Sequence, residues 1–175
     1  MLGAFDSARA SDAMVWPSSG FWLAALHNGF AIETVFRRTG DLAGSTHCAV
    51  VSCGKYQVGF RLLMDSQHCL LLQFGGGEDG GAPLAIRIPD VVPANEWTHF
   101  EARISSPDAQ GRRTVRAQMN KGAPIEKSMR RNILPAPDFP LGLGVEYRQP
   151  NMSSKTWPAF PGQIRSLRID SIPAP

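Results

Sequence analysis

The sequence predicts an all-β domain built as a two-sheet antiparallel sandwich, and three observations predict it. Short segments in which apolar and polar residues alternate recur along the 175-residue chain, and alternation is the period of a half-buried strand. The 17 Gly and 14 Pro residues are spread along the chain, as turns between many short strands require. Helical periodicity is weak throughout. Because roughly ten to twelve strands exceed one flat sheet, we expect two packed sheets.

The strand pattern is clearest in segment 30–37, where Ile32 and Phe36 fall on one face and Glu33 falls on the other. Asp65 favours a turn within 64–67, so the segments on either side form a hairpin. Short turns between consecutive segments indicate antiparallel pairing. The other expected strands are 48–53, 57–64, 69–74, 84–88, 97–104, 114–119, 125–129, 139–147 and 160–169, with 89–96 as a connection.

The length suits one domain that buries a core of its own. We expect residues 1–20 to be an N-terminal extension or first edge strand, 21–170 to form the sandwich, and 171–175 to be a C-terminal tail or linker. The chain shows no signal peptide. The linker-like tail favours a piece of a larger extracellular or periplasmic protein, with a cytoplasmic location as the alternative.

The charge pattern argues against two classes of partner. Eighteen Lys and Arg residues against fifteen Asp and Glu give a net charge of only +3. Without a basic stripe or a recognisable motif, we expect no nucleic-acid partner. No apolar run has the length of a membrane span, so we expect no membrane partner. The densest basic pairs, expected at solvated strand ends and in loops, are Arg37-Arg38, Arg112-Arg113 and Arg130-Arg131.

The three cysteines, Cys48, Cys53 and Cys69, are an odd number and so cannot form a closed disulfide framework. Their spacing does not suit a zinc site. We expect small buried hydrophobes. One disulfide beside one free thiol is the alternative that the sequence leaves open.

Three segments in order, 30–37, 95–104 and 141–144 with 160–169, resemble the concanavalin A-like superfamily, specifically its laminin-G-like domains. The first is similar to the family's F-x-I-E-x-W-x-R strand, with Val35 in place of Trp. The second is similar to its W-x-H-V-A strand, and the third to its closing L-G-x-G and F-x-G-x-I strands. Segment 119–122 departs from the family's v-D-G pattern, and there is no late Cys pair. The resemblance implies a jelly roll of two curved antiparallel sheets that binds sugars or proteins.

Some members of the superfamily are glycoside hydrolases, which need two carboxylates a short distance apart. The similar enzymes carry a Glu-x-Asp-x-x-Glu run that this chain lacks. Glu101 is followed two residues later by Arg103, and such pairing lowers the pKa of an acid, which is the wrong direction for a general acid. We therefore predict no catalytic residue, and a hydrolase or lyase of the same fold is the least favoured alternative.

Polar side chains on the non-core faces of several strands are the first candidate ligand site, and we expect several to gather on the concave sheet. Arg, Gln and Glu donors and acceptors suit a glycan, especially an acidic one. The alternative is a solvated face with cross-strand pairs. These residues are Arg61, Gln73, Glu101, Arg103, Arg116 and Gln118.

A polar loop at the rim offers a second candidate site, with Tyr147, Asn151 and Trp157, because sugar rings stack on aromatic faces and rim loops carry binding sites. Trp97 is expected to plug the core or an edge. His99 is expected to make a structural hydrogen bond under a loop.

Together these observations predict a non-catalytic carbohydrate-binding module, a lectin-type accessory domain whose partner is a glycan or polysaccharide. The alternative is a protein-interaction or structural sandwich that packs on a neighbouring domain of a parent protein. We predict no cofactor and no metal. Calcium needs several oxygen ligands, and no Asp-rich loop supports it.

Overall fold

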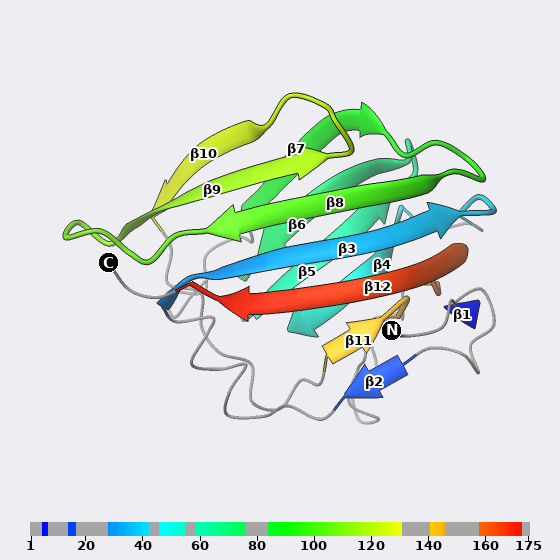
Figure 1. The fold of residues 1–175 in the computed structure, drawn as a ribbon, viewed down its shortest axis with the longest axis horizontal. Helices are drawn as coiled ribbons and strands as arrows, with labels where there is room; N and C mark the ends of the chain where they lie inside the picture. Colours follow the sequence, from blue (N-terminus) through cyan, green and yellow to red (C-terminus); the bar gives the residue numbers. More distant parts are fainter. Residues whose placement is uncertain are drawn as a thin grey trace.

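The computed structural model describes residues 5–6, 14–16, 28–42, 46–54, 59–75, 84–130, 141–145 and 158–172. In these ranges the chain forms twelve strands in two six-stranded sheets that pack face to face (Figure 1). All strand pairs are antiparallel. The predicted all-β sandwich is therefore confirmed. No helix within the described ranges is long and apolar enough to cross a membrane.

The two sheets draw on different parts of the chain. The sheet nearer the viewer in Figure 1, which we call the front sheet, has the order β1 (Phe5–Asp6), β12 (Gly162–Ser171), β3 (Phe30–Arg38), β8 (Trp97–Ile104), β9 (Arg112–Met119) and β10 (Ile125–Arg130). The back sheet has the order β2 (Met14–Trp16), β11 (Leu141–Leu143), β4 (His47–Gly54), β5 (Gly59–Asp65), β6 (Cys69–Phe74) and β7 (Leu84–Val91).

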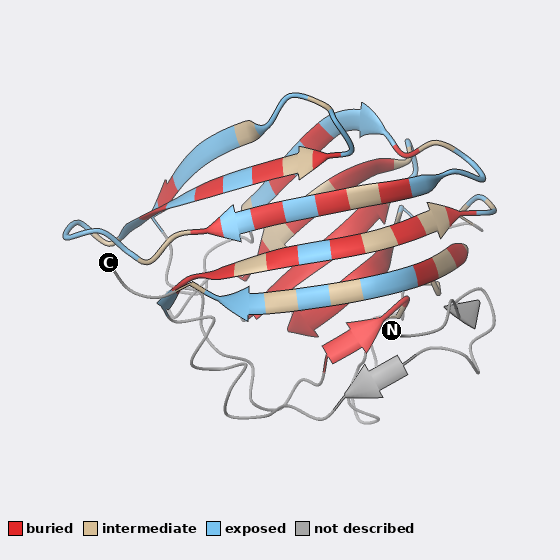
Figure 2. Ribbon diagram, viewed as in Figure 1, coloured by how far each residue is buried: buried red, intermediate tan, exposed pale blue. Residues whose placement is uncertain are grey.

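The front sheet follows the predicted alternation. Along β8, Phe100, Ala102 and Ile104 are buried, and the residues between them point to water or are half-buried. Figure 2 shows the same banding on β3, β8 and β9. The inward residues meet the back sheet, and the rings of Phe30 and Phe60 lie with their centroids 5.2 Å apart across the sandwich. One face of the front sheet is thus free to carry function.

The back sheet is buried more completely. All residues of β5 except Asp65 are buried, and so are all residues of β4 except His47. Its sequence accordingly reads as apolar runs rather than as alternation. Cys48 and Cys53 of β4 and Cys69 of β6 are buried free thiols, as expected of small core hydrophobes. Burial raises the pKa of Cys48 to about 12 and that of Cys53 to about 11.

Several expected strand boundaries are wrong, those of β7 and β11 by the most. Strand β7 continues past residue 88 to Val91, because it is an edge strand and its register against β6 shifts between Cys69 and Leu70. Pro89 lies opposite this irregularity, where no ladder N–H is needed. Strand β11 is shorter than the expected 139–147, since it ends where Gly144 takes a φ of 68° and its N–H bonds to the Val50 carbonyl.

The first twenty residues contribute two short edge strands. Phe5–Asp6 pairs with β12 at the border of the front sheet, and Met14–Trp16 pairs with β11 at the border of the back sheet. The expected division at residues 20 and 170 stays a prediction.

The basic pairs were expected to be solvated, and this expectation is wrong for one arginine in each of two pairs. Arg113 is 1% exposed, and its Nη1 donates to the carbonyl of Ser105 at 2.9 Å. Burial lowers the pKa of this guanidinium. Arg113 takes an inward position in the alternation of β9, near the strand's start, where a long side chain reaches the backbone of the preceding connection. Arg38 is also buried.

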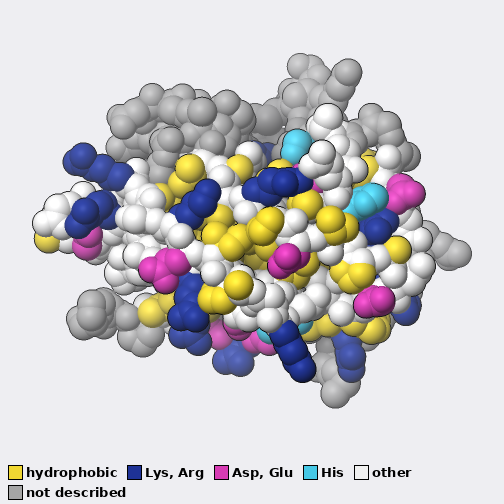
Figure 3. Space-filling view, turned by 90° about the horizontal axis from the view of Figure 1, so that it is seen from above, with side chains coloured by type: hydrophobic (Ala, Val, Ile, Leu, Met, Phe, Trp, Pro, Cys, Tyr) yellow, Lys and Arg dark blue, Asp and Glu magenta, His cyan; other side chains and the backbone are white. Residues whose placement is uncertain are grey.

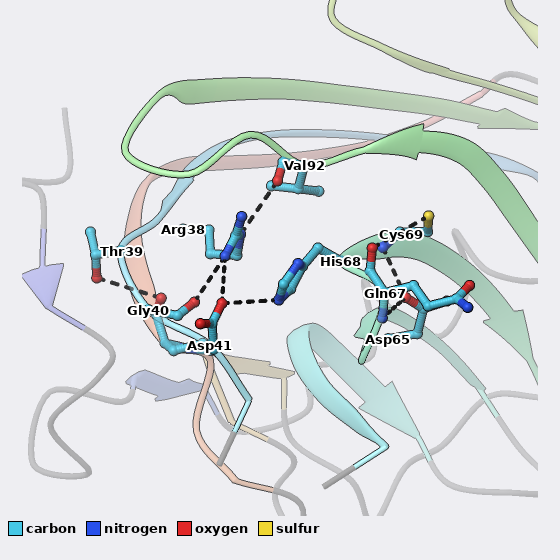
Figure 4. Close-up of polar contacts among 10 residues, drawn as sticks. Arg38, Thr39, Gly40, Asp41, Asp65, Gln67, His68, Cys69 and Val92 are labelled. Atoms are coloured by element: carbon cyan, nitrogen blue, oxygen red, sulfur yellow. Dashed lines mark hydrogen bonds and ion pairs between the residues drawn. The ribbon is translucent and has the colours of Figure 1, made fainter. Parts of the chain in front are cut away.

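Arg38 anchors one end of the sandwich (Figure 4). Its Nη1 lies 2.8 Å from Asp41 Oδ1, which also lies 3.1 Å from Nε2 of His68. The Nε of Arg38 donates to the Val92 carbonyl at 3.3 Å. The turn before His68 is the predicted one, with Asp65 Oδ1 accepting the N–H of the residue two positions later. These bonds join three connections from both sheets.

Substitution of Phe60 by Ala is expected to lower the free energy of unfolding by about 3–5 kcal/mol, because it removes a buried ring that bridges the two sheets. Equilibrium urea denaturation measures this difference. Val91→Ala, at a side chain that is 56% exposed, is the control and should stay within about 0.5 kcal/mol. Equal losses in the two variants would contradict the described core.

A second expectation concerns His47, at the start of β4. Burial lowers the pKa of His47; Asp65 opposes this shift and Arg61 adds to it. The unfolded chain, with an ordinary His pKa of about 6.5, then binds the proton more readily than the folded chain. The free energy of unfolding should therefore fall as the pH drops below about 6.5.

Urea denaturation at a series of pH values measures this dependence. His47→Gln should flatten the loss on the acid side, whereas the control His99→Gln should retain it. A His47→Gln profile that runs parallel to the wild type would contradict this assignment.

Candidate functional site

The outward face of β8 and β9 brings four of the predicted site residues together. The antiparallel register sets Glu101 opposite Gln118 and Arg103 opposite Arg116. Ala102 lies between the two pairs and points into the core, so the four polar side chains share the opposite face. The sequence placed each side chain on the outer face of its strand, and the register makes them neighbours.

These strands form a shallow depression of about 290 Å³. We call it the β8–β9 depression. Its floor is strand backbone, because the two alanines at its centre have buried side chains. It is lined by Glu101, Ala102, Arg103, Arg116, Ala117 and Gln118.

The two arginines of the β8–β9 depression are like charges that face each other. Arg103 and Arg116 lie directly opposite each other, an arrangement that costs a few tenths of a kcal/mol to about 1 kcal/mol for like charges. Within the part of the chain that the structure describes, neither guanidinium has a hydrogen bond or ion pair. Glu126 faces Arg116 from β10 without forming an ion pair with it. Their donors are therefore available to an anion.

The acceptors around the arginines are partly committed. The Nε2 of Gln118 donates to the Gly122 carbonyl at 2.9 Å, which leaves its Oε1 free to accept. Glu101 is exposed on the sheet face. The depression thus offers guanidinium donors beside carboxylate and amide acceptors, a mixture that suits a ligand with both an acidic group and hydroxyls.

Glu33 of β3 lies opposite Glu101, so two acidic residues are neighbours across adjacent strands. Spacing of acids along a single strand does not reveal this pair, because its members belong to different strands. His99 Nε2 lies 2.9 Å from Glu33 Oε1. The ring of His99 therefore does not make the expected hydrogen bond under a loop. Its backbone instead bonds to a turn residue: the His99 N–H donates to Asn120 Oδ1, and the His99 carbonyl accepts from the Asn120 N–H. Both carboxylates are exposed, unlike a general acid held in an apolar pocket.

Arg61 and Gln73 do not join this site. They are neighbours on β5 and β6, where Arg61 Nη2 donates to Gln73 Oε1. Arg61 is 5% exposed and belongs to the back sheet, on the face turned away from the core. The expectation that several of these residues gather on one sheet is wrong for this pair. Alternation tells which face of its own sheet a residue takes, but not which sheet it joins.

Tyr147, Asn151 and Trp157 lie outside the described residues, so the rim-loop site stays a prediction. Trp97 is not the plug that the sequence suggested. It is 37% exposed, and the guanidinium carbon of Arg37 lies 4.9 Å from its ring centroid. Trp97 is four residues before Glu101 on β8, and alternation therefore places both on the outward face. This spacing could have predicted the exposure of Trp97.

Metal-ligating side chains do not converge within the described ranges: no three of His, Cys, Asp and Glu there are placed to hold an ion. Calcium binding stays untested.

Comparison with known proteins identifies the fold. No family model and no curated protein matches the sequence. Among solved structures, the CBM40 domain of the Ruminococcus gnavus IT-sialidase, bound to α2,3-sialyllactose, matches with a TM-score of 0.58 and 15% identity over 97% of this chain and 87% of its own. Domains LG4-5 of the mouse laminin α1 chain match with a TM-score of 0.57 and 15% identity over 96% of this chain.

The chain has the laminin-G-like jelly-roll fold. The fold that the three ordered segments implied is thereby confirmed. The leech intramolecular trans-sialidase, complexed with 2,7-anhydro-Neu5Ac, matches with a TM-score of 0.62 and 14% identity over 98% of this chain. This chain spans 38% of the laminin fragment and 25% of the leech enzyme. At such identities the likeness shows the fold.

Proposed function

We propose that this domain binds a glycan bearing an acidic group in the β8–β9 depression, as a non-catalytic module of a larger glycan-active protein. The observation that carries the proposal is the pair Arg103 and Arg116, two unneutralised guanidiniums set side by side over a shallow polar depression. A guanidinium binds a carboxylate through two parallel hydrogen bonds, and such charge-assisted bonds are the strong ones. Glu101 and the free Oε1 of Gln118 accept sugar hydroxyls.

The electrostatics favour this function over a merely solvated face. A face selected only for solubility and sheet stability would set opposite charges across the strands, since like charges there are unfavourable. An anion placed between Arg103 and Arg116 turns that repulsion into two attractive contacts. Anion binding therefore accounts for the unfavourable pairing of the two arginines, whereas solvation alone does not.

The comparisons supply independent support. The Ruminococcus domain is seen with α2,3-sialyllactose and the leech enzyme with 2,7-anhydro-Neu5Ac, both derived from an acidic sugar. A structure of botulinum neurotoxin type C, of which this chain spans 36%, matches with a TM-score of 0.61 and 12% identity, and cell entry of that toxin depends upon interaction with two ganglioside molecules. The same fold thus occurs in several proteins that are described with acidic glycans. We also propose an extracellular or periplasmic location for the present domain.

A second candidate function has its own observation. Figure 3 shows apolar side chains gathered at the centre of the view from above, the side toward which β7 and β10 lie in Figure 1. Val91 of β7 is 56% exposed, and the partly buried Leu84 and Ile125 belong to the same two edge strands. A neighbouring domain of a parent protein would cover this side by apolar contact. Such docking leaves the β8–β9 depression accessible and is compatible with glycan binding.

Titration calorimetry with α2,3-sialyllactose, and with lactose as the neutral counterpart, tests the proposed glycan site. We expect the acidic trisaccharide to bind more tightly than lactose and to weaken as salt rises. Arg116→Ala should reduce its affinity about tenfold or more, because charge-assisted hydrogen bonds are lost.

The matched control is Arg112→Ala on the same strand, whose guanidinium is engaged by Asp108 at 3.0 Å. It should bind like the wild type. Free glucuronic acid, a single acidic sugar, serves as a second acidic probe. Failure of both acidic probes to bind the folded domain, or equal binding by the Arg116 variant, would refute the proposed site.

A further inference from the structure

Trp97 stands at the other end of the outward face of β8 from the two arginines. Residues 97, 99, 101 and 103 share this face because side chains alternate along a strand. At about 3.3 Å per residue, Trp97 lies about 13 Å along the strand from Glu101 and about 20 Å from Arg103. Trp97 and Val91 are the two exposed large hydrophobic residues within the described ranges. Of these two, only Trp97 shares a face with the β8–β9 depression.

The surroundings of Trp97 hold its ring in place. Arg37 lies opposite it in the β3–β8 register, and Gln163 lies opposite Arg37 in the β12–β3 register. The guanidinium of Arg37 packs on the ring and donates through Nη2 to Gln163 Oε1. Cation–π contact and this hydrogen bond together limit the motion of the ring. An exposed aromatic ring that is fixed in this way loses little conformational freedom when a ligand stacks on it.

Two further features distinguish this end of the face. Arg165 sits where the β12–β3 register shifts between Ile164 and Ser166, and its guanidinium carbon lies 5.8 Å from the Trp97 ring centroid. A bulge of this kind re-aims a side chain at a functional position. The Nε of Arg37 is buried and has no hydrogen-bond partner in the structure.

Between the two ends the face is acidic. Glu33 and Glu101 lie opposite each other midway, and only Glu33 is paired, with His99. An anionic group bound here would meet like charge, whereas hydroxyl groups would find acceptors. The charge order along β8 is therefore cationic with an aromatic ring, then acidic, then cationic.

We propose that Trp97, with Arg37 and Arg165, forms a second sugar subsite on the same face, so that the domain binds an extended acidic oligosaccharide along β8. The acidic sugar occupies Arg103 and Arg116, neutral sugars cross the acidic middle, and a distal sugar stacks against the Trp97 ring. This inference rests on the proposed glycan function and adds the direction and length of the ligand. It also predicts poor binding of a chain that is acidic at every sugar.

The test compares α2,3-sialyllactose with a longer α2,3-sialylated oligo-N-acetyllactosamine by calorimetry. The longer chain should bind the wild type at least about fivefold more tightly. Trp97→Ala should abolish this gain and leave the affinity for α2,3-sialyllactose unchanged, whereas Arg116→Ala should weaken both ligands. Trp97→Phe, which keeps an aromatic ring, should retain part of the gain, and Val91→Ala should retain all of it.

A second measurement does not depend on how well the Trp97→Ala variant folds. In the wild-type protein, the indole N–H resonance of Trp97, assigned by its absence in Trp97→Phe, should shift with the longer chain and stay in place with α2,3-sialyllactose. Equal affinities for the two ligands and an unmoved indole resonance would overturn the second subsite while leaving Arg116-dependent binding intact. Loss of all acidic-glycan binding in the folded wild type would instead overturn the proposed function.

Discussion

The inward residues of β3, β8 and β9 are apolar along most of their length and the outward residues are mostly polar, and the other features of the molecule depend on this division. The inward set supplies about a third of the buried core, with Phe30 meeting Phe60 of the opposite sheet. Because side chains alternate strictly, a strand committed to this core leaves its other face to water. The outer face of the front sheet is therefore a rigid, regular surface on which register alone decides which residues are neighbours.

Register explains why the candidate site could be only half predicted. The sequence located the strands and the outward position of Arg103 and Arg116, since both follow from local alternation. It could not tell that these two face each other, because a pairing between strands depends on the lengths of the turns and on the core packing. The same missing information concealed the Glu33–Glu101 pair and assigned Arg61 to a surface that it does not share.

The back sheet shows where alternation loses its predictive value. Strands β4 and β5 are buried on both faces, so their sequences are nearly continuous apolar runs, and Arg61 gives no sign of its burial. A similar limit applies to Arg38 and Arg113. Arginines near strand ends read as solvated charges, yet their long side chains lie buried and bond to backbone carbonyls. Length and multiple donors let arginine fill positions that a pattern of polarity would leave to water.

The outer face of the front sheet combines features that stability alone does not require. Two arginines face each other, and two glutamates face each other one row away. On the same face, two residues before His99, a tryptophan remains partly exposed. A sheet free to optimise its surface would interleave the signs and bury the ring. Segregated charges cost little each, within about 1 kcal/mol, so the fold tolerates them easily. Their joint occurrence on one face, in an order that would match an acidic end, a hydroxyl-rich middle and a stacked sugar ring, is the basis on which we propose ligand binding there.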